Sequence, residues 1–237
     1  MRSYGQYCAL AKALDVVGDR WALLIVRELL LRPCRYNELL DGLTGIATNL
    51  LADRLRQLET AGVIGHDADA RYELTEWGQK LEAPVQELIR WAAPLMLEGQ
   101  GTDTFRLRWL ELPLELLFGG VDPRRPDIQI EVRTAQEVLT VTSVGGSVNV
   151  RTGYALTPDV VVTGSPELIV GLMSGAIEKE LAISKGVNIL GDFNHVEKLR
   201  RDDWLDPTLP ERFQGKWEDV SRGLACARGV DTPNTNE

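Results

Sequence analysis

The sequence predicts two domains, a mostly helical one at the N-terminus and an α+β domain, a sheet backed by helices, at the C-terminus. Up to residue 98, apolar residues recur mainly with helical spacing, and beyond it several extended segments precede short helices. The glycine-rich stretch 99–103 separates the two patterns. We therefore expect domains at 1–98 and 127–206, a linker and connecting helix at 99–126, and a loop-like tail at 207–237.

The first domain is predicted to begin with two helices within residues 7–32, the second of them capped by Asp19. That second helix is apolar around most of its circumference, as a central buried helix is. A short amphipathic helix near 39–43, a turn at 44–46 and a longer helix over 48–61 follow. These three elements are typical of a helix-turn-helix.

The longer helix carries Leu51, Leu55 and Leu58 at spacings of four and three residues, which places them on one buried stripe. Gly62 follows as a C-cap. Two short extended segments within 63–74 are expected to pair as a hairpin, and a helix is expected over 76–98. Helix, helix-turn-helix, hairpin and helix is the order of a winged helix-turn-helix.

The second domain is predicted from alternating apolar segments and turn residues. A connecting helix is expected over 105–118. Ser165 is expected to cap a later helix whose first residue is Pro166. The expected strands lie at 128–133, 138–143, 148–152, 159–163 and near 187–190, with two short helices before the last strand and one helix from about 192.

Charge and cysteine usage narrow the functional classes. The net charge of −9 argues against a broad, non-specific coating of nucleic acid. Residues 1–98 are the less acidic part, with 11 Lys and Arg against 14 Asp and Glu, so DNA binding there requires a local basic patch. Three distant cysteines, no secretory leader pattern and no long apolar run predict a cytoplasmic protein.

Residues 8–91 resemble the HxlR family of bacterial transcription regulators. The matching segments are 8–21, 29–33, 35–40, 45–59 (GIATNLLADRLRQLE), 62–64 and 72–78. The resemblance implies a dimer that binds double-stranded operator DNA. Two positions depart from the family pattern, because Ala9 replaces a proline and Ala47 replaces a serine, which leaves Thr48 as the expected helix cap.

Asn49, Asp53 and Arg56 lie opposite the buried leucine stripe and are the candidate base-reading residues. Asn pairs with adenine, and Arg pairs with guanine or phosphate. The alternative is that they are ordinary solvent-facing residues. Arg35 and Thr48 are candidate phosphate contacts and Arg71 is a further candidate in the hairpin, although two aspartates at the hairpin tip weaken any contact there.

Residues 158–200 resemble the sterol-carrier-protein fold, through segments 159–167, 172–176 and 187–193. The resemblance implies a domain that encloses lipids or other apolar molecules. The alternative is that the same residues fill a core between sheet and helices. The candidate pocket residues are Ile169, Leu172, Met173, Ile177, Leu181, Phe193 and Val196.

Cys8 is a candidate thiol sensor, because in part of the HxlR family the equivalent cysteine senses electrophiles or oxidants. Lys12, one turn later, is placed to stabilise its thiolate. The alternative is that Cys8 is a small residue in an interface. His66 and His195 have no Cys or His at metal-ligand spacing, so we expect no metal, and the sequence predicts no cofactor.

The sequence as a whole predicts a DNA-binding transcription regulator of the HxlR type that responds to an apolar small molecule bound by the C-terminal domain. The alternatives are a thiol-sensing regulator acting through Cys8, with a structural C-terminal domain, and a lipid-binding carrier protein. An enzyme is not expected, because no nucleotide loop or nucleophile–base pair is found. The helix at 76–98 has more apolar residues than one face packed within the same chain requires, which predicts a homodimer built by this helix and the N-terminal helix. The residues concerned are Val85, Leu88, Ile89, Ala92, Leu95 and Met96.

Overall fold

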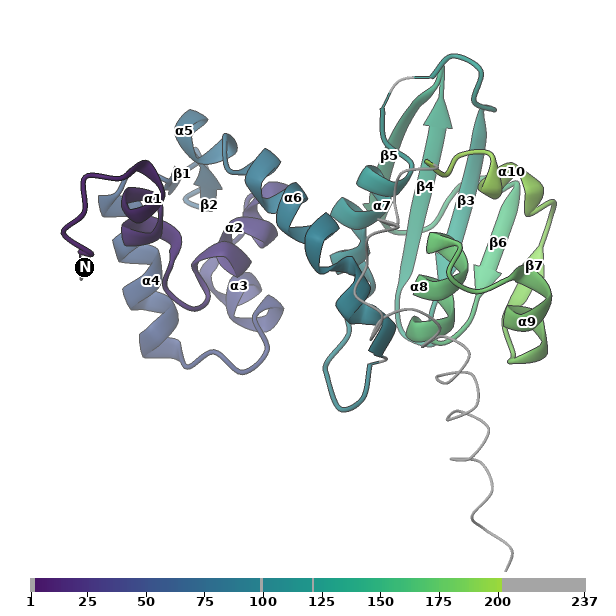
Figure 1. Ribbon diagram of the computed structural model, residues 1–237, viewed down its shortest axis with the longest axis horizontal. Coiled ribbons are helices and arrows are strands. Elements are labelled where there is room, and N and C mark those ends of the chain that lie inside the picture. The colour runs from purple at the N-terminus through teal and green to yellow at the C-terminus, as the bar shows by residue number, and fades with distance from the viewer. Residues whose placement is uncertain (1–2, 99, 121, 202–237) are drawn as a thin grey trace, which may run out of the picture. The chain divides into compact units, whose positions relative to one another are not determined.

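The computed structural model describes residues 3–98, 100–120 and 122–201 (Figure 1). The chain divides into two compact units between Leu88 and Ile89, inside helix α6, rather than after residue 98. The division lies there because Ile89 and Ala93 pack against the apolar core of the second unit. The predicted tail at 207–237 lies outside the described residues.

The first unit has the element order of a winged helix-turn-helix (Figure 1). The strands β1 and β2 pair antiparallel, with Ile64 opposite Leu74, and form the predicted hairpin. The elements are α1 (Ala9–Val17), α2 (Ala22–Leu31), α3 (Tyr36–Gly42), α4 (Thr48–Thr60), β1 (Ile64–His66), β2 (Tyr72–Leu74), α5 (Glu76–Gln79) and α6 (Glu82–Ala92).

The core of the first unit is built on the leucine stripe of α4. Leu51, Leu55 and Leu58 are at most 1% exposed, so the predicted buried face of this helix is confirmed. Ile25 of α2 and Leu39 of α3 are fully buried as well. Burial of this stripe leaves the opposite side of α4 free to face solvent.

Three helix ends, one in α2 and two in α4, differ from the sequence prediction. The N-cap of α2 is Trp21 in the left-handed region (φ 81°), not Asp19. The N-cap of α4 is Ala47, without a side-chain hydrogen bond, so Thr48 is the first helical residue rather than the cap. The C-cap of α4 is Ala61, and Gly62 follows it with φ +74°. Asp19 lies two residues before the N-cap of α2, and its carboxylate instead pairs with Arg54, 2.9 Å away.

The helix predicted over 76–98 is interrupted. It consists of α5, α6 and a 3-10 helix, η1 (Ala93–Glu98). Pro84 explains the first break, since proline inside a continuous helix would lose a hydrogen bond and clash with the carbonyl of Lys80. Starting α6 at Glu82 places Pro84 in the first turn, where proline is tolerated.

The second unit is a five-stranded sheet with the order β5-β4-β3-β6-β7. The pairing of β3 with β6 is parallel and the other pairings are antiparallel. The strands are β3 (Ile128–Arg133), β4 (Val138–Val144), β5 (Ser147–Thr152), β6 (Val160–Thr163) and β7 (Asn188–Leu190). The helices are η2 (Leu107–Leu110), α7 (Glu111–Leu117), α8 (Pro166–Ser174), α9 (Lys179–Ser184) and α10 (Asn194–Glu197).

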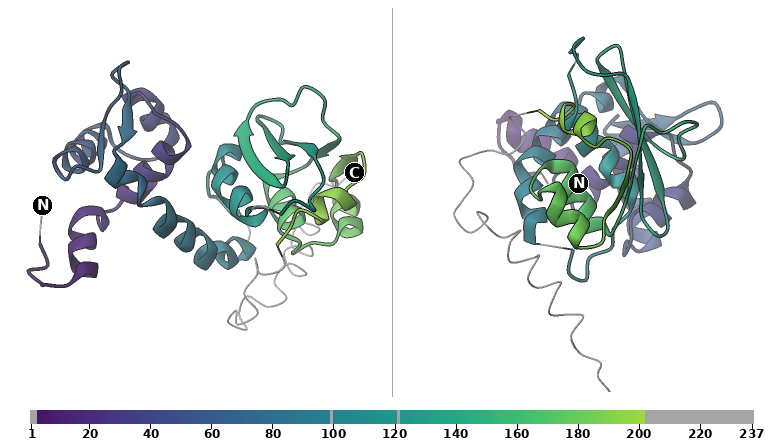
Figure 2. Two further views of the ribbon diagram at one scale, coloured as in Figure 1. Left: turned by 90° about the horizontal axis from the view of Figure 1, so that it is seen from above. Right: turned by 90° about the vertical axis from the view of Figure 1, so that its right-hand side faces the viewer.

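Helices cover one face of this sheet (Figure 2). Alternate strand residues point into the core on that face, among them Ile130, Val141 and Val162, all fully buried. A sheet backed by helices is therefore present, as predicted, and α8 does begin at Pro166 after Ser165, although the Ser165 hydroxyl makes no capping bond.

Within the linker and connecting helix predicted at 99–126, residues 107–117 form two short helices, η2 and α7, that pack in the second unit. Leu107, Leu110 and Leu117 are buried in the core of the second unit. The Glu115 carboxylate accepts a hydrogen bond from the backbone N–H of Val150 (3.2 Å), at the exposed edge of β5. The segment belongs to the second unit because its apolar residues and edge-capping carboxylates complete the sheet.

Candidate nucleic-acid interface

The start of α4 is held by the preceding helix. The hydroxyl of Tyr36, the first residue of α3, donates a hydrogen bond of 2.7 Å to the backbone carbonyl of Thr48. Together with the buried leucine stripe, this contact fixes both the position of α4 and its rotation about its axis. The exposed face of α4 is therefore presented in a defined orientation.

The predicted base-reading residues share that exposed face. Asn49 is exposed in the first turn, the Arg56 side chain is 70% exposed and the Asp53 side chain is 48% exposed. These three residues bring hydrogen-bond donors and acceptors to one side of the helix, the groups that read base edges in a major groove.

Asp53 is the centre of a hydrogen-bond network on this face. Its carboxylate accepts from Gln57 Nε2 (2.8 Å), from Arg56 Nη1 (3.3 Å) and from Arg54 Nη1 (3.4 Å). The charge of Asp53 is thus already balanced inside the protein. Any contact that Arg56 makes with DNA has to exchange for this ion pair.

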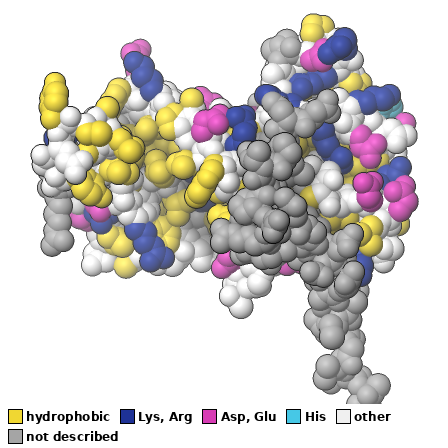
Figure 3. Space-filling model, in the orientation of Figure 1, with side chains coloured by type: hydrophobic (Ala, Val, Ile, Leu, Met, Phe, Trp, Pro, Cys, Tyr) yellow, Lys and Arg dark blue, Asp and Glu magenta, His cyan; other side chains and the backbone are white. Residues whose placement is uncertain are grey.

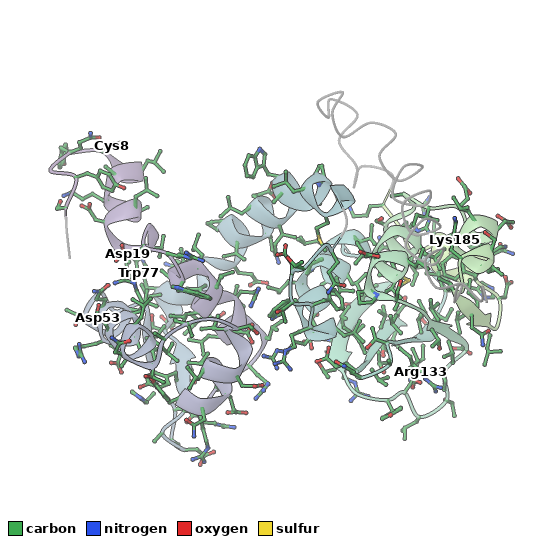
Figure 4. All side chains as sticks on the ribbon, turned by 90° about the horizontal axis from the view of Figure 1, so that it is seen from below. Cys8, Asp19, Asp53, Trp77, Arg133 and Lys185 are labelled. Carbon is green, nitrogen blue, oxygen red and sulfur yellow. The ribbon has the colours of Figure 1, made fainter. Side chains whose placement is uncertain are left out.

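Arg54 is a charged residue of this region that the sequence patterns did not single out. Its Nη1 lies 2.9 Å from Asp19 Oδ2 and 3.4 Å from Asp53 Oδ2, so it joins the start of α2 to the exposed face of α4. Figure 4 shows Asp19 and Asp53 in the first unit. The sequence showed only that Arg54 is a basic residue beside the buried face of a helix. Its partner, Asp19, lies 35 positions earlier in the chain, and helical periodicity cannot predict a pairing between residues so far apart.

Arg35 and Thr48 are both exposed, at the starts of α3 and α4. The backbone N–H of Arg35 donates to Glu38 Oε2 (2.7 Å), and Glu38 Oε1 accepts from Arg32 (2.8 Å). These bonds lower the pKa of Glu38, the one from Arg35 having the larger effect. The structure leaves the Arg35 and Thr48 side chains on the solvent side of the helix-turn-helix.

Arg71 differs from the other candidate DNA contacts in being paired with two acidic side chains. Its Nε lies 2.7 Å from Asp67 Oδ2 and its Nη2 lies 3.2 Å from Asp69 Oδ2, so two carboxylates hold its guanidinium. The backbone N–H of Arg71 and then its side chain lower the pKa of Asp67. The hairpin tip therefore carries its own counter-charges.

Cys8 is exposed and is the N-cap of α1. The backbone N–H groups of Ala11 and Leu10 lower the pKa of its thiol below the ordinary value, which favours a thiolate. The ammonium of Lys12, predicted to stabilise the thiolate, lies 3.7 Å from Asp15 Oδ2. Cys34 is buried, with its Sγ 3.3 Å from the carbonyl of Arg32.

The seven candidate pocket residues come together in the core of the second unit. Six of them are at most 4% exposed and Leu181 is partly buried. They share this core with strand residues such as Ile130 and Val162. The arrangement fits both a filled core and an apolar enclosure.

Apolar side chains also remain exposed on the first unit and along α6 and η1 (Figure 3). Along α6 and η1 they recur at positions 88, 91 and 95, with the spacing of one helix face. Of the six residues predicted to exceed the needs of one chain, Leu88, Leu95 and Met96 are exposed, whereas Val85 is buried and Ile89 packs on the core of the second unit. The large apolar side chains exposed on these elements are Tyr4, Tyr7, Leu10, Leu14, Leu24, Trp77, Leu88, Trp91, Leu95 and Met96.

Neither a metal-binding cluster nor a membrane-spanning helix is found in the described part of the chain. Among those residues, no three His, Cys, Asp or Glu side chains are grouped so that they could hold a metal ion. No helix among the residues described is long and apolar enough to cross a membrane.

Residues 16–99 match the family model of the HxlR-like helix-turn-helix. An uncharacterised HTH-type transcriptional regulator of Synechocystis sp., sll1512, is 36% identical over 84 residues, which cover 33% of this chain and 62% of that protein. An uncharacterised HTH-type transcriptional regulator of Bacillus subtilis, YvaP, is 33% identical over 87 residues, covering 34% of this chain and 81% of that protein. The crystal structure of quinone-bound YodB from B. subtilis has 34% identity and a TM-score of 0.33, over 35% of this chain and 93% of that one.

Proposed function

Because this chain belongs to the HxlR-like helix-turn-helix family, whose relatives are transcriptional regulators, we propose that it binds operator DNA through α4 and thereby regulates transcription. The observation that carries this proposal is the division of α4 into two faces. Leu51, Leu55 and Leu58 are buried, and Asn49, Asp53 and Arg56 face solvent in the first three turns. A recognition helix presents its N-terminal residues to base edges in this way.

The chemistry of these residues suggests a role for each. Asn49 is suited to bidentate pairing with adenine and Arg56 to guanine or phosphate, while Asp53 can accept from the exocyclic amine of cytosine. Arg35 and Thr48, exposed at two helix starts, are assigned to phosphates flanking the bases that α4 reads.

The functional form is proposed to be a homodimer. Exposed apolar side chains lie near α1 in the first unit and, separately, along α6 and η1, and monomeric proteins rarely leave large apolar patches in water. A two-fold dimer reads two inverted half-sites whose centres are about one turn of DNA, roughly 34–36 Å, apart.

Selection from sheared genomic DNA tests the proposal. Fragments retained by the purified protein should share an inverted repeat with that half-site spacing, and an oligonucleotide carrying the repeat should compete with them. Retained fragments without a shared sequence would contradict base reading by α4. Retention of no DNA at all would favour the carrier-protein alternative.

For the second unit we propose the binding of an apolar or amphipathic small molecule that alters operator affinity. The supporting observation is that the seven candidate residues, which come from α8, α9, the turn between them and the start of α10, converge on one core with the sheet. Apolar enclosure contributes about 25 cal/mol per Å2 removed from water. Regulation further requires that the ligand prefer one arrangement of the protein, with a coupling of about 1–3 kcal/mol.

Native mass spectrometry of the purified protein should detect a bound apolar species. Met173→Trp should displace that species and leave the fold intact, because Met173 is 1% exposed in the cluster and its replacement fills any remaining space. A crystal structure whose core is completely filled by side chains would contradict ligand binding.

Cys8 supports a different mode of regulation, in which its thiolate reacts with an electrophile or oxidant and the protein then releases DNA. The exposed thiol and its lowered pKa favour this reaction. One solved relative, YodB, is quinone-bound. Alkylation of Cys8 that releases DNA from the wild type but not from Cys8→Ser would establish thiol sensing, with the second unit as a structural element.

A further inference from the structure

The hairpin formed by β1 and β2 has a tip in which one arginine is enclosed by two aspartates. Arg71 donates to Asp67 (Nε–Oδ2, 2.7 Å) and lies 3.2 Å from Asp69 (Nη2–Oδ2). The three side chains together carry a net charge of −1. The guanidinium is therefore occupied before any DNA approaches.

The turn itself holds this arrangement in place. Asp67 Oδ1 accepts hydrogen bonds from the backbone N–H groups of Asp69 (2.9 Å) and Arg71 (2.8 Å). Ala70 adopts a left-handed conformation (φ 58°), which brings Arg71 back toward Asp67. Both oxygens of Asp67 are thus engaged in the turn, whereas the carboxylate of Asp69, on a side chain 68% exposed, lies beside Arg71 and takes no part in holding the turn.

The hairpin belongs to the same unit as the candidate recognition helix. β1 packs beside α4, and Nδ1 of His66 in β1 lies 3.3 Å from Oε1 of Glu59 in α4. A duplex docked on the exposed face of α4 extends beyond it on either side, so phosphates near the hairpin would meet two carboxylates and a paired arginine.

We propose that Arg71 is a latent phosphate-binding residue and that Asp69, with Asp67, holds it away from DNA and so limits affinity. This inference rests on the proposed DNA-binding function. Its consequence is that sequence-independent binding is kept weak, and that recognition depends on the base contacts of α4. Removing the Asp69 charge leaves Asp67 on the Nε side of Arg71 and should free the Nη2 side of its guanidinium for one additional phosphate contact.

The test compares the wild type with Asp69→Asn on a random-sequence duplex and on a selected operator. Asp69→Asn keeps the backbone N–H that donates to Asp67, so the turn is retained. Affinity should rise about threefold to tenfold on both duplexes, and the salt dependence should steepen by about one ion, because each phosphate contact adds roughly 0.9 to the slope. Unchanged affinity and slope would overturn the inference.

Glu180→Gln is the matched control. Glu180 is an exposed carboxylate of the second unit, 3.7 Å from Lys179, and its replacement changes net charge by the same amount. It should leave DNA affinity unchanged. An equal gain with Glu180→Gln would attribute the effect to net charge and overturn the inference.

Arg71→Ala completes a double-mutant cycle. Alone it should change DNA affinity by less than about twofold, and combined with Asp69→Asn it should remove the gain. A loss with Arg71→Ala alone as large as that with Arg56→Ala would show that Arg71 already binds DNA. If only Asp69→Asn binds duplex, the inference holds and base reading by α4 fails; if neither protein binds, both fail.

Discussion

Arg56 lies one helical turn beyond Asp53 on the exposed face of α4, with its Nη1 3.3 Å from Asp53 Oδ1. An exposed ion pair of this kind contributes only about 0–1 kcal/mol, because water screens both charges. A good base contact contributes about 1–3 kcal/mol. Exchange of Asp53 for a base edge is therefore favourable, and Arg56 can serve both the free protein and the complex.

Arg56→Ala should weaken operator binding by roughly 1–3 kcal/mol, and Asn49→Ala should relax sequence preference more than it lowers affinity. Fluorescence anisotropy with the operator and with single-base variants measures both effects. Arg124→Ala is the control, since that guanidinium is 90% exposed in the second unit and pairs with Asp122. If both test variants bound the operator with wild-type affinity and selectivity, the assignment of α4 as the recognition helix would be wrong.

Leu88→Asp should shift the protein from dimer to monomer. Leu88 is 47% exposed on α6, and burying a charge in an apolar interface is costly. Sedimentation velocity at micromolar concentration measures the change. Leu156→Asp, at a side chain 94% exposed in the second unit, should leave the dimer intact. The proposed interface would be excluded if the wild type were already monomeric.

Gly78→Ala should destabilise the first unit by about 1–3 kcal/mol, the usual range for overpacking. A Cβ on Gly78 would lie 2.0 Å from the carbonyl oxygen of Val63, where only a backbone shift can make room. Gly65→Ala is the control, since its Cβ would meet Thr75 Cγ2 at 3.8 Å. Urea unfolding curves of the two variants should separate clearly, and equal midpoints would contradict the close approach.

Cys8 should react with iodoacetamide much faster than Cys34 in the folded protein. Cys8 is exposed with a lowered thiol pKa, whereas Cys34 is 3% exposed. Peptide mapping after timed alkylation, in a Cys226→Ser background, gives the two rates. Because a second candidate sensor is present, Cys8→Ser should retain effector-dependent DNA release. Complete loss of release in that variant would make Cys8 the main switch.

The ionised carboxylate of Asp122 should stabilise the folded protein at neutral pH and lose this effect in acid. Its hydrogen bonds with the Arg124 side chain and backbone lower its pKa from 3.8 to about 2. A carboxylate with a lowered pKa in the folded state stabilises that state above its unfolded pKa, and the effect is lost as pH falls from about 4 to about 2. The difference in Tm between wild type and Asp122→Asn should therefore shrink across this range. A constant difference would contradict it.

Local sequence patterns were sufficient to predict most of the helices and strands. Leu51, Leu55 and Leu58 predicted the buried face of α4, and alternating residues predicted β3 with its observed bounds. Both patterns arise from the backbone period of one element, so neighbouring residues along the chain contain the information. The exposure of Asn49 and Arg56 followed from the same helical geometry.

Only the tertiary structure decided which charges meet. Asp19 was predicted as a cap but pairs with Arg54, and Arg71 was predicted as a DNA contact but is held by Asp67 and Asp69. Segment 105–118 likewise read as a connecting helix, although its leucines complete the core of the second unit. Ion pairs and core contacts depend on distances between elements that the chain brings together only on folding, and helical or strand periodicity carries no information about those distances.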